Sequence, residues 1–264
     1  MYKEKIKQLL RAGYPKDWAK IAPFALWKMD AIIDGGEAYY LPEYDYYYVI
    51  YNNHLLFYSS PDDMCHIPID VLNQLDAISL PDHLFNQIKD ELYGFNVDFG
   101  WSLTYDFSYI PPPTTDTIYS AVDFDFTNEG DYQCAVNIIG GGDISWISAE
   151  QVRRMTEFTA FDPSLWFFVY DNESDKKIAI SISTYSPEVR ETLLDWIFVL
   201  PDYQGKGAGR FLINETITRC KDKSDLICVG GTVEFYRRCG FVDDTLWIWA
   251  TKPDYDFRCE AIQP

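Results

Sequence analysis

The spacing of apolar residues changes from helical to strand-like early in the chain. Over residues 1–35 the apolar positions share one face of a helix, which predicts one or two helices that end at Asp34-Gly35-Gly36. Two aromatic-rich runs follow at residues 44–51 and 54–58, and the Asn52-Asn53 pair between them predicts a two-stranded hairpin. The same spacing arguments predict short helices over 68–75 and 83–92 and a strand over 101–109.

Three consecutive prolines, Pro111 to Pro113, separate this part from a more regular one. Such a run favours extended polyproline geometry and interrupts both helices and central strands. We therefore expect one domain over residues 1–112 and a second over 117–264. From Ile118 onward the pattern predicts the order strand, helix, helix, three strands, helix, strand, helix, strand. The predicted strands cover 118–126, 165–170, 177–185, 191–200, 225–229 and 246–251, and the predicted helices cover 131–139, 148–159, 206–220 and 232–239.

Residues 194–210 join one of these strands to the helix that follows it. The apolar run 196–200 predicts a buried strand, which Pro201 and Asp202 end. The next residues, 204–209, form a glycine-rich turn that leads into the helix. Glycine permits φ > 0 and close approach of the backbone, and the first N–H groups of a helix lack partners within it. The turn is therefore a candidate site for a phosphate group.

Two common phosphate-binding motifs do not match this turn. The Walker A string G-x-x-x-x-G-K-[ST] does not occur in the chain. A Rossmann fingerprint requires a third glycine where Arg210 follows Gly205-x-Gly207. Asp225 nevertheless lies near the position of the ribose-binding acid, so spacing alone leaves a dinucleotide open.

A third motif matches more closely. Gln204-x-x-Gly207-x-Gly209, preceded by Val-x-Pro, resembles the acetyl-CoA loop of the GNAT superfamily, the GCN5-related N-acetyltransferases. Residues 235–241 also match that family's F-Y-x-x-x-G-F string. The resemblance covers about residues 117–252. It implies an α/β fold with a mixed, mostly antiparallel sheet flanked by helices, and it leaves residues 1–112 as an α+β extension, either a lid or a degenerate second copy of the fold.

The resemblance also implies roles for single residues. Tyr236 matches the tyrosine that protonates the leaving thiolate, a task that suits a phenol with a pKa near 10. Val229 stands where the family often has an asparagine that contacts pantetheine, so other short acyl-CoA donors stay open. Strand residues whose N–H groups face the acetyl oxygen and pantetheine match Ile197, Phe198 and Val199. The residues that would hold the pyrophosphate of acetyl-CoA are Gln204, Gly205, Lys206, Gly207, Ala208 and Gly209.

The base that would deprotonate the acceptor amine has no motif of its own. Strict alternation along the strand would place Glu191, Leu193, Asp195, Ile197 and Val199 on one face. Asp195 and Glu191 are therefore the candidate bases, acting directly or through water.

Composition narrows the range of partners. A net charge of −19 repels phosphate backbones and anionic lipid and attracts a cationic substrate, so we expect neither a nucleic-acid nor a membrane partner. The six cysteines are scattered without a C-x-x-C pair, and the three histidines form no cluster with metal-ligand spacing. We therefore expect reduced thiols, no metal and a cytoplasmic protein. No apolar run is long enough to span a bilayer, and the N-terminus does not have the pattern of a signal peptide.

The resemblance to the GNAT superfamily implies an acetyl-CoA-dependent N-acetyltransferase that transfers an acetyl group to a primary amine of a small molecule or peptide by direct attack. The alternative class is a non-catalytic acyl-CoA-binding or regulatory module that keeps the loop but turns nothing over, and Tyr236→Phe separates the two. A nucleotide-binding protein that uses the same loop is a third class, which competition between coenzyme A and nucleotides would identify. The sequence is compatible with an oligomer and contains no motif that identifies the acceptor.

Overall fold

The chain forms two compact units in a computed structural model. The structure describes residues 2–14, 16–17, 22–59, 62–110, 118–141, 147–231 and 233–255. Unit 1 combines residues 1–103 with 243–263, and unit 2 comprises residues 104–242. The predicted boundary at Pro111 to Pro113 lies outside the described residues. The division between the units falls earlier in the chain, after Leu103, and a second time after Val242.

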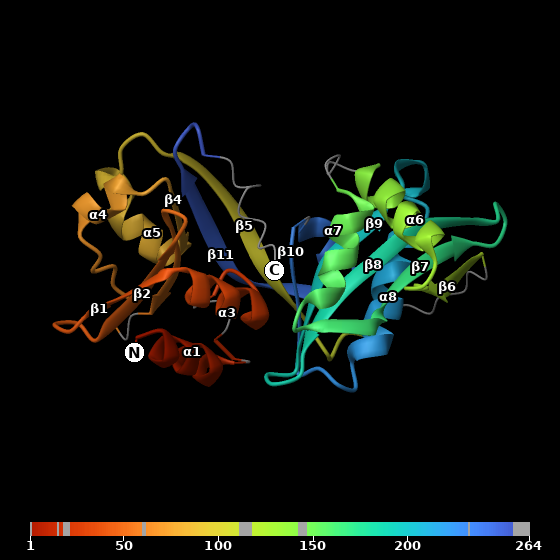
Figure 1. Cartoon of the computed structure of the whole chain (residues 1–264), viewed down its shortest axis with the longest axis horizontal. Coiled ribbons are helices and arrows are strands. Elements are labelled where there is room, and N and C mark those ends of the chain that lie inside the picture. Colours follow the sequence, from red (N-terminus) through yellow and green to blue (C-terminus); the bar gives the residue numbers. More distant parts are fainter. Residues whose placement is uncertain are drawn as a thin grey trace. The chain divides into compact units, whose positions relative to one another are not determined.

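Unit 1 packs helices against one mixed sheet (Figure 1). Its strands lie in the order β1-β2-β3-β4-β11-β5, and β3 pairs with β4 in parallel. The antiparallel pairs include β1 with β2, β2 with β3, and β4 with β11. Its elements are α1 (Tyr2–Gly13), α3 (Leu26–Gly35), β1 (Glu37–Leu41), β2 (Tyr46–Tyr51), β3 (His54–Ser59), α4 (Ile69–Gln74), β4 (Ala77–Pro81), α5 (Asp82–Ile88), a 3₁₀ turn (Lys89–Glu91), β5 (Asn96–Tyr105) and most of β11 (Phe241–Thr251).

The hairpin of β2 and β3 turns on two asparagines. Asn52 and Asn53 adopt φ angles of 48° and 62°, the left-handed conformation that a two-residue hairpin turn requires. Tyr51 pairs with His54 across the turn, so the predicted hairpin is confirmed. Strands β1 and β4, in contrast, were not among the sequence predictions.

The strands of unit 2 lie in the order β10-β9-β8-β7-β6. Neighbouring strands are antiparallel except β10, which runs parallel to β9. A capping box formed by Ser148 and Gln151 is present at the start of α7. The elements are β6 (Tyr119–Asp123), α6 (Glu129–Gly140), α7 (Ala149–Arg154), a 3₁₀ turn (Met155–Glu157), β7 (Phe161–Asp171), β8 (Lys176–Ser186), β9 (Glu191–Val199), a 3₁₀ turn (Pro201–Tyr203), α8 (Ala208–Cys220), β10 (Leu226–Gly230) and α9 (Val233–Arg237).

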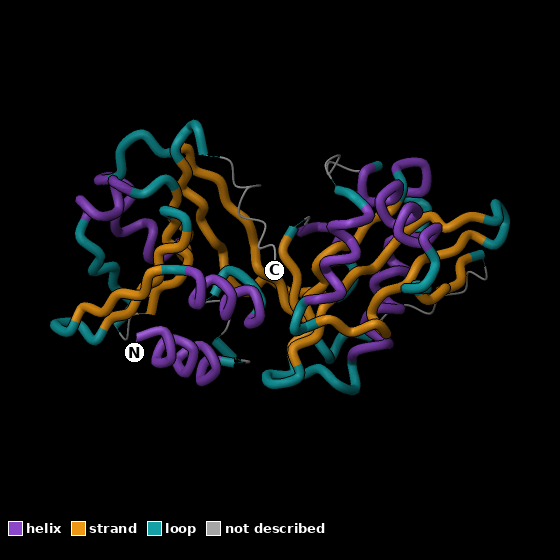
Figure 2. The backbone as a smooth tube through the Cα atoms, viewed as in Figure 1, coloured by secondary structure: helices purple, strands orange, loops and turns teal. Residues whose placement is uncertain are grey.

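Aromatic and aliphatic side chains of β7 bury both faces of the unit 2 sheet. Phe167 and Val169 pack under α8 together with Leu212. Trp166 and Phe168 point to the opposite face, where both contact Phe124, whose ring in turn packs against Tyr132 of α6. The sheet therefore lies between α6 on one face and α8 on the other (Figure 2). This layering places the start of α8 next to the end of β9.

The element order predicted from Ile118 onward is confirmed, from β6 through α6, α7, β7, β8, β9, α8, β10 and α9 to β11. The described elements from α1 to β5 show the same succession as those from α6 to β11: helices, three strands, a helix, a strand, a helix and a strand. The strand after α4 and the strand after α8 each run parallel to the strand that precedes that helix.

Candidate active site

The site begins where β9 and β10 stop pairing. The parallel pairing joins Leu226 to Glu191 and ends at Cys228 opposite Leu193. Among the described residues, β9 continues to Val199 with no partner strand on that side. A gap between two parallel strands exposes backbone N–H and C=O groups inside the unit. It therefore offers hydrogen bonds to a ligand that enters between the strands.

The opposite edge of β9 contains a bulge. Trp196 pairs with Ile182 of β8, but Leu193 pairs with Thr184, so β9 has one residue more than β8 between these pairs. The extra residue lies at Leu194 and Asp195, opposite one residue of β8. The sequence had no signal for it, because a bulge is defined by the register of the partner strand.

The bulge reverses the alternation of side chains along β9. Ile197 pairs with Ser181, whose hydroxyl contacts Thr216 of α8, so Ile197 faces α8. Thr192 lies on the same face, because it pairs with Tyr185, which is four residues after Ser181 in the regular strand β8. Glu191 therefore faces away from α8. The prediction that Glu191 and Ile197 share one face is wrong, because it assumed a strand without a bulge.

Backbone direction separates the three predicted contact residues of β9. The N–H of Leu200 donates to the carbonyl of Ile178 on β8, at 2.9 Å. Since backbone groups alternate along a strand, the N–H of Phe198 also points to β8, and those of Ile197 and Val199 point to the side that β10 has left. The side chain of Gln204 confirms this direction, because its Nε2 donates to the carbonyl of Val199 at 3.1 Å.

The glycine-rich loop has the backbone conformation that its sequence suggested. Gly205 and Gly207 adopt φ angles of 73° and 95°, in the left-handed region that favours glycine. Gly207 is the N-cap of α8, and its carbonyl accepts the N–H of Phe211 at 3.0 Å. A Cβ atom added to Gly205 would meet nothing within 4 Å, and one added to Gly207 would meet only the Tyr119 ring at 3.8 Å. An anion thus has both space and the N–H groups of a helix start.

Gly209 brings three segments of unit 2 together. A Cβ atom on it would lie 3.1 Å from Cζ of Phe235 and 3.6 Å from Cγ2 of Val199. The start of α8, the end of β9 and the helix α9 therefore meet at one point. The predicted loop, strand and tyrosine motif are neighbours although they are far apart in the sequence.

Tyr236 lies next to this meeting point in a largely buried position. Only 8 % of the residue is exposed, and its ring packs edge-on against Phe235 and Phe241. Burial, with a smaller effect from Cys239, raises the pKa of the Tyr236 hydroxyl well above its ordinary value. The hydroxyl therefore keeps its proton at neutral pH. Gly240 of the same motif has a φ of 95°.

The two candidate carboxylates differ in exposure. Glu191 is 1 % exposed, and Sγ of Cys228 lies 3.4 Å from its Oε1. Asp195 is only partly buried and lies at the bulge. A base needs access to the amine, so the geometry favours Asp195 over Glu191.

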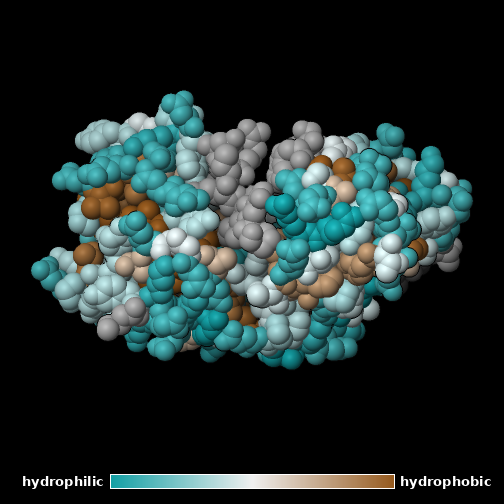
Figure 3. Space-filling model, viewed as in Figure 1, coloured by the Kyte–Doolittle hydropathy of each residue, from teal (hydrophilic) through white to brown (hydrophobic). Residues whose placement is uncertain are grey.

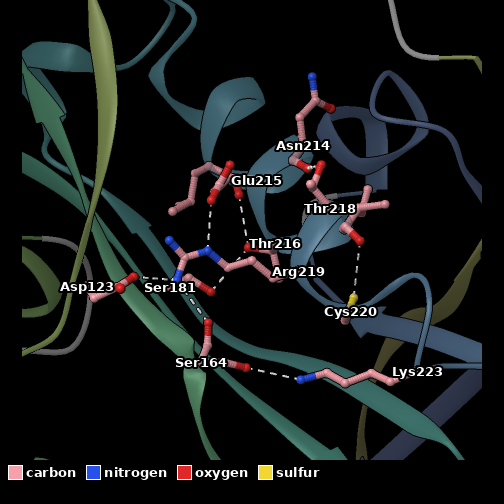
Figure 4. Close-up of polar contacts among 12 residues, drawn as sticks. Asp123, Ser164, Ser181, Asn214, Glu215, Thr216, Thr218, Arg219, Cys220 and Lys223 are labelled. Atoms are coloured by element: carbon pink, nitrogen blue, oxygen red, sulfur yellow. Dashed lines mark hydrogen bonds and ion pairs between the residues drawn. The ribbon is translucent and has the colours of Figure 1, made fainter.

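Helix α8 is held on the sheet by a polar network at its C-terminal half (Figure 4). Arg219 donates to Glu215 at 2.8 Å, to Asp123 of β6 at 2.7 Å and to the carbonyl of Ser164 of β7 at 2.9 Å. In the buried interior, Thr216 donates to Ser181 of β8 at 3.2 Å. These contacts fix the helix whose N-terminus closes the loop.

A separate cavity lies in unit 1 and contains none of the predicted site residues. It has a volume of about 500 Å³ and is lined by polar and apolar residues of the α3–β1 corner, β2 and α4, including Glu37, Tyr39, Asn53 and Leu75. Among the residues that the structure describes, no group of three or more His, Cys, Asp or Glu side chains could hold a metal ion. Within the same residues, no helix has the length and apolar character to cross a membrane. On the face drawn in Figure 3, hydrophilic residues cover most of each unit.

Comparisons with known proteins agree with this geometry. Residues 163–243 match the family model described as "Acetyltransferase (GNAT) domain". No curated protein sequence matches the chain significantly. Among solved structures, a GCN5-related N-acetyltransferase from Sphaerobacter thermophilus is 13% identical, with 95% of this chain and 89% of that chain covered and a TM-score of 0.62. A GNAT-family acetyltransferase from Colwellia psychrerythraea is 10% identical, with 94% and 97% covered and a TM-score of 0.59.

A third structure is described as a GCN5-related glucosamine N-acetyltransferase region in a fungal multi-domain β-N-acetylglucosaminidase. It is 11% identical, with 95% of this chain and 37% of that chain covered and a TM-score of 0.58. At these identities the structures show a shared fold, and the fold extends over nearly the whole chain. The GNAT fold of these structures agrees with the family match over residues 163–243. Residues 163–243 of the second unit thus match a GNAT acetyltransferase domain.

Proposed function

We propose that the protein is an acetyl-CoA-dependent N-acetyltransferase that acts on a primary amine of a small molecule or peptide. The observation that carries the proposal is the separation of β9 from β10 after Leu193, with the loop 204–209 at the far end of the exposed strand edge. A ligand of coenzyme A's shape needs both features, a phosphate site and a strand edge that an amide-rich arm can pair with. Both lie within unit 2.

Acetyl-CoA fits the residues of the loop. The open space beside Gly205 and Gly207 accommodates a pyrophosphate, and the N–H groups at the start of α8 supply hydrogen bonds to it. The N–H groups of Ile197 and Val199 are directed at the gap, where they would bind pantetheine and the acetyl oxygen. The bound donor supplies a thioester whose acetyl group is open to attack by an amine.

The protein residues then have two proton-transfer tasks. Tyr236 donates a proton to the departing thiolate, because burial keeps its hydroxyl protonated. Asp195 accepts a proton from the attacking amine, directly or through water, from its partly buried position at the bulge. No covalent bond to the enzyme forms in this scheme. The acceptor would be cationic, because a net charge of −19 attracts amines in their protonated form.

Calorimetric titration tests the proposal directly. We expect purified protein to bind acetyl-CoA but not ATP or NAD. The variant Gly207→Glu should abolish binding, because it places a carboxylate beside the phosphates. Gly140→Glu is the matched control, since Gly140 lies at the end of α6 and a Cβ there meets nothing within 4 Å. Absence of acetyl-CoA binding by folded wild-type protein would sink the proposal.

Turnover separates the enzyme from a non-catalytic acyl-CoA-binding module. Amines should be screened by thiol release from acetyl-CoA, with glucosamine among them because of the fungal structure described above. If the protein is an enzyme, thiol release should depend on the amine. It should also fall in Tyr236→Phe, while acetyl-CoA binding stays unchanged. Binding without turnover for any amine would favour the module.

We also propose that unit 1 is a degenerate copy of the same fold and takes no part in binding the acyl donor. Its described elements from α1 to β5 follow the same order as those from α6 to β11. Residues 62–68, which lead from β3 to α4, contain no glycine. Acetyl-CoA titration of a Glu37→Gln variant, which alters the unit 1 cavity, should therefore give the wild-type affinity.

A further inference from the structure

We infer that Tyr119 is a positioning residue that orients one peptide of the phosphate loop, so that the N–H of Gly207 faces the ligand. The inference rests on the proposed binding of acetyl-CoA at the loop. Tyr119 lies on β6, far from the loop in sequence, and its hydroxyl donates to the carbonyl of Lys206 at 2.9 Å. No sequence motif includes this tyrosine.

The geometry of a trans peptide links this hydrogen bond to the ligand side. The C=O and N–H of one peptide unit point in opposite directions. When the Lys206 carbonyl points toward Tyr119, the N–H of Gly207 must point away from it. The direction matters because the opposite orientation would aim a carbonyl oxygen at the negative oxygens of a phosphate.

Gly207, which borders this peptide, and Gly205, which precedes Lys206, make the backbone here easy to rotate. Gly205 and Gly207 have positive φ angles, and glycine adopts positive and negative φ about equally well. As glycines, neither residue has a side chain whose packing could fix the backbone conformation. A partner for the carbonyl between them is therefore the simplest means of selecting one orientation.

Tyr119 is rigid enough for this task. The residue is 8 % exposed and packs with Phe167, Val169, Ala208 and Leu212 in the core under α8. Its ring is thus fixed by the sheet and by the first turn of the same helix that the loop enters. The hydroxyl reaches the loop from a position that the packing defines.

A second chain of hydrogen bonds holds the other flank of the loop. The hydroxyl of Tyr203, in the 3₁₀ turn before the loop, lies 3.0 Å from Oγ of Ser174, and that Oγ donates to Asp171 at 2.6 Å. Ser174 lies in the turn between β7 and β8, and Asp171 is the last residue of β7. The loop therefore has fixed supports on both sides of its two flexible glycines.

The test is Tyr119→Phe, which removes the hydroxyl and keeps the ring. We expect calorimetry to show about tenfold weaker binding of acetyl-CoA, about 1.4 kcal/mol, the upper range for one neutral hydrogen bond. Binding of S-acetylpantetheine, which lacks the pyrophosphate, should not change. With an active acceptor, KM for acetyl-CoA should rise while kcat stays within twofold. Tyr170→Phe is the control, because this hydroxyl contacts Asp175 and not the loop.

Unchanged acetyl-CoA affinity in Tyr119→Phe would overturn the inference, and so would an equal loss for acetyl-CoA and S-acetylpantetheine, which would indicate a general effect on the fold. A nitrogen-15 glycine spectrum gives a second test that does not require the donor. The Gly207 resonance should shift or broaden in the variant while that of Gly140 stays in place. If wild-type protein bound no acetyl-CoA, the proposed function would fail, and this spectrum would still decide whether Tyr119 orients the loop.

Discussion

The variant Gly207→Ala isolates the cost of the left-handed loop conformation. Gly207 has a φ of 95°, and an added Cβ would meet only Cε2 of Tyr119 at 3.8 Å, an ordinary contact distance. Steric overlap with neighbours is therefore absent, and the cost is that of an L-residue in the left-handed region. That cost is about 1–2 kcal/mol. For a protein of this size it lowers Tm by roughly 2–8 °C.

Two further alanine variants separate this cost from other effects of glycine replacement. Gly140→Ala, at the last residue of α6, meets nothing within 4 Å and should be neutral or stabilise the protein by up to about 1 kcal/mol. Gly209→Ala gains helix propensity in the first turn of α8, but its Cβ would lie 3.1 Å from Phe235. We expect these opposing terms to leave it between the other two. The free energy of unfolding in denaturant gives the order.

The reasoning is refuted if Gly207→Ala unfolds with the same free energy as Gly140→Ala. It would then follow that the loop does not require a left-handed residue at the N-cap of α8. A loss far above 2 kcal/mol would also contradict the structure, because it would require a steric clash that the distance to Tyr119 excludes. Acetyl-CoA affinity, measured on the same samples, should fall in Gly207→Ala, because its methyl group occupies space beside the proposed phosphate site.

Three other predictions concern the site and its support. Tyr236→Phe should lower kcat about 100-fold or more with little change in acetyl-CoA affinity. Burial raises the pKa of the Tyr236 hydroxyl, so the wild-type rate should not fall through loss of its proton up to about pH 10. Burial alone would raise the pKa of Asp162, but hydrogen bonds from Lys223 and Ser164 outweigh it and hold that pKa below its ordinary value. The Lys223→Met variant should therefore lose about 1 kcal/mol of stability at pH 7, a difference that shrinks in acid titrations below about pH 4. Arg219→Lys should cost about 1 kcal/mol in denaturant unfolding, because lysine cannot reproduce the fork that reaches the carbonyl of Ser164.

Most of the fold of unit 2 could be predicted from the sequence, because its strands and helices are long enough to show their period. The predicted helix over 206–220 and strand over 191–200 agree closely with α8 and β9. In unit 1 the strand β4 is a run of five residues between two short helices. It is too short to show an alternation of apolar and polar residues. β1 begins directly after a helix and was missed for the same reason.

The site divides in the same way between local and long-range features. The left-handed glycines of the loop follow from their own sequence, since few other residues adopt that conformation. The bulge at Leu194 and Asp195 depends on which residues of β8 pair with β9. The sequence of β9 alone does not determine this register. The role of Tyr119 depends on a contact with a residue 87 positions away. The prediction that Glu191 and Ile197 share a face of β9 is wrong for this reason, because the bulge between them reverses the alternation of side chains.

The two units differ at the helix that follows the strands β3 and β9. In unit 2 the helix after β9 is α8, which has 13 residues and a left-handed glycine, Gly207, at its N-cap. The corresponding helix of unit 1, α4, has six residues and follows Pro68, which has no N–H to donate. The segment before it contains Asp62 and Asp63, and their carboxylates would repel a phosphate. Within the described residues, α4 and residues 62–68 before it therefore lack the long helix and the left-handed glycine that are found at the start of α8.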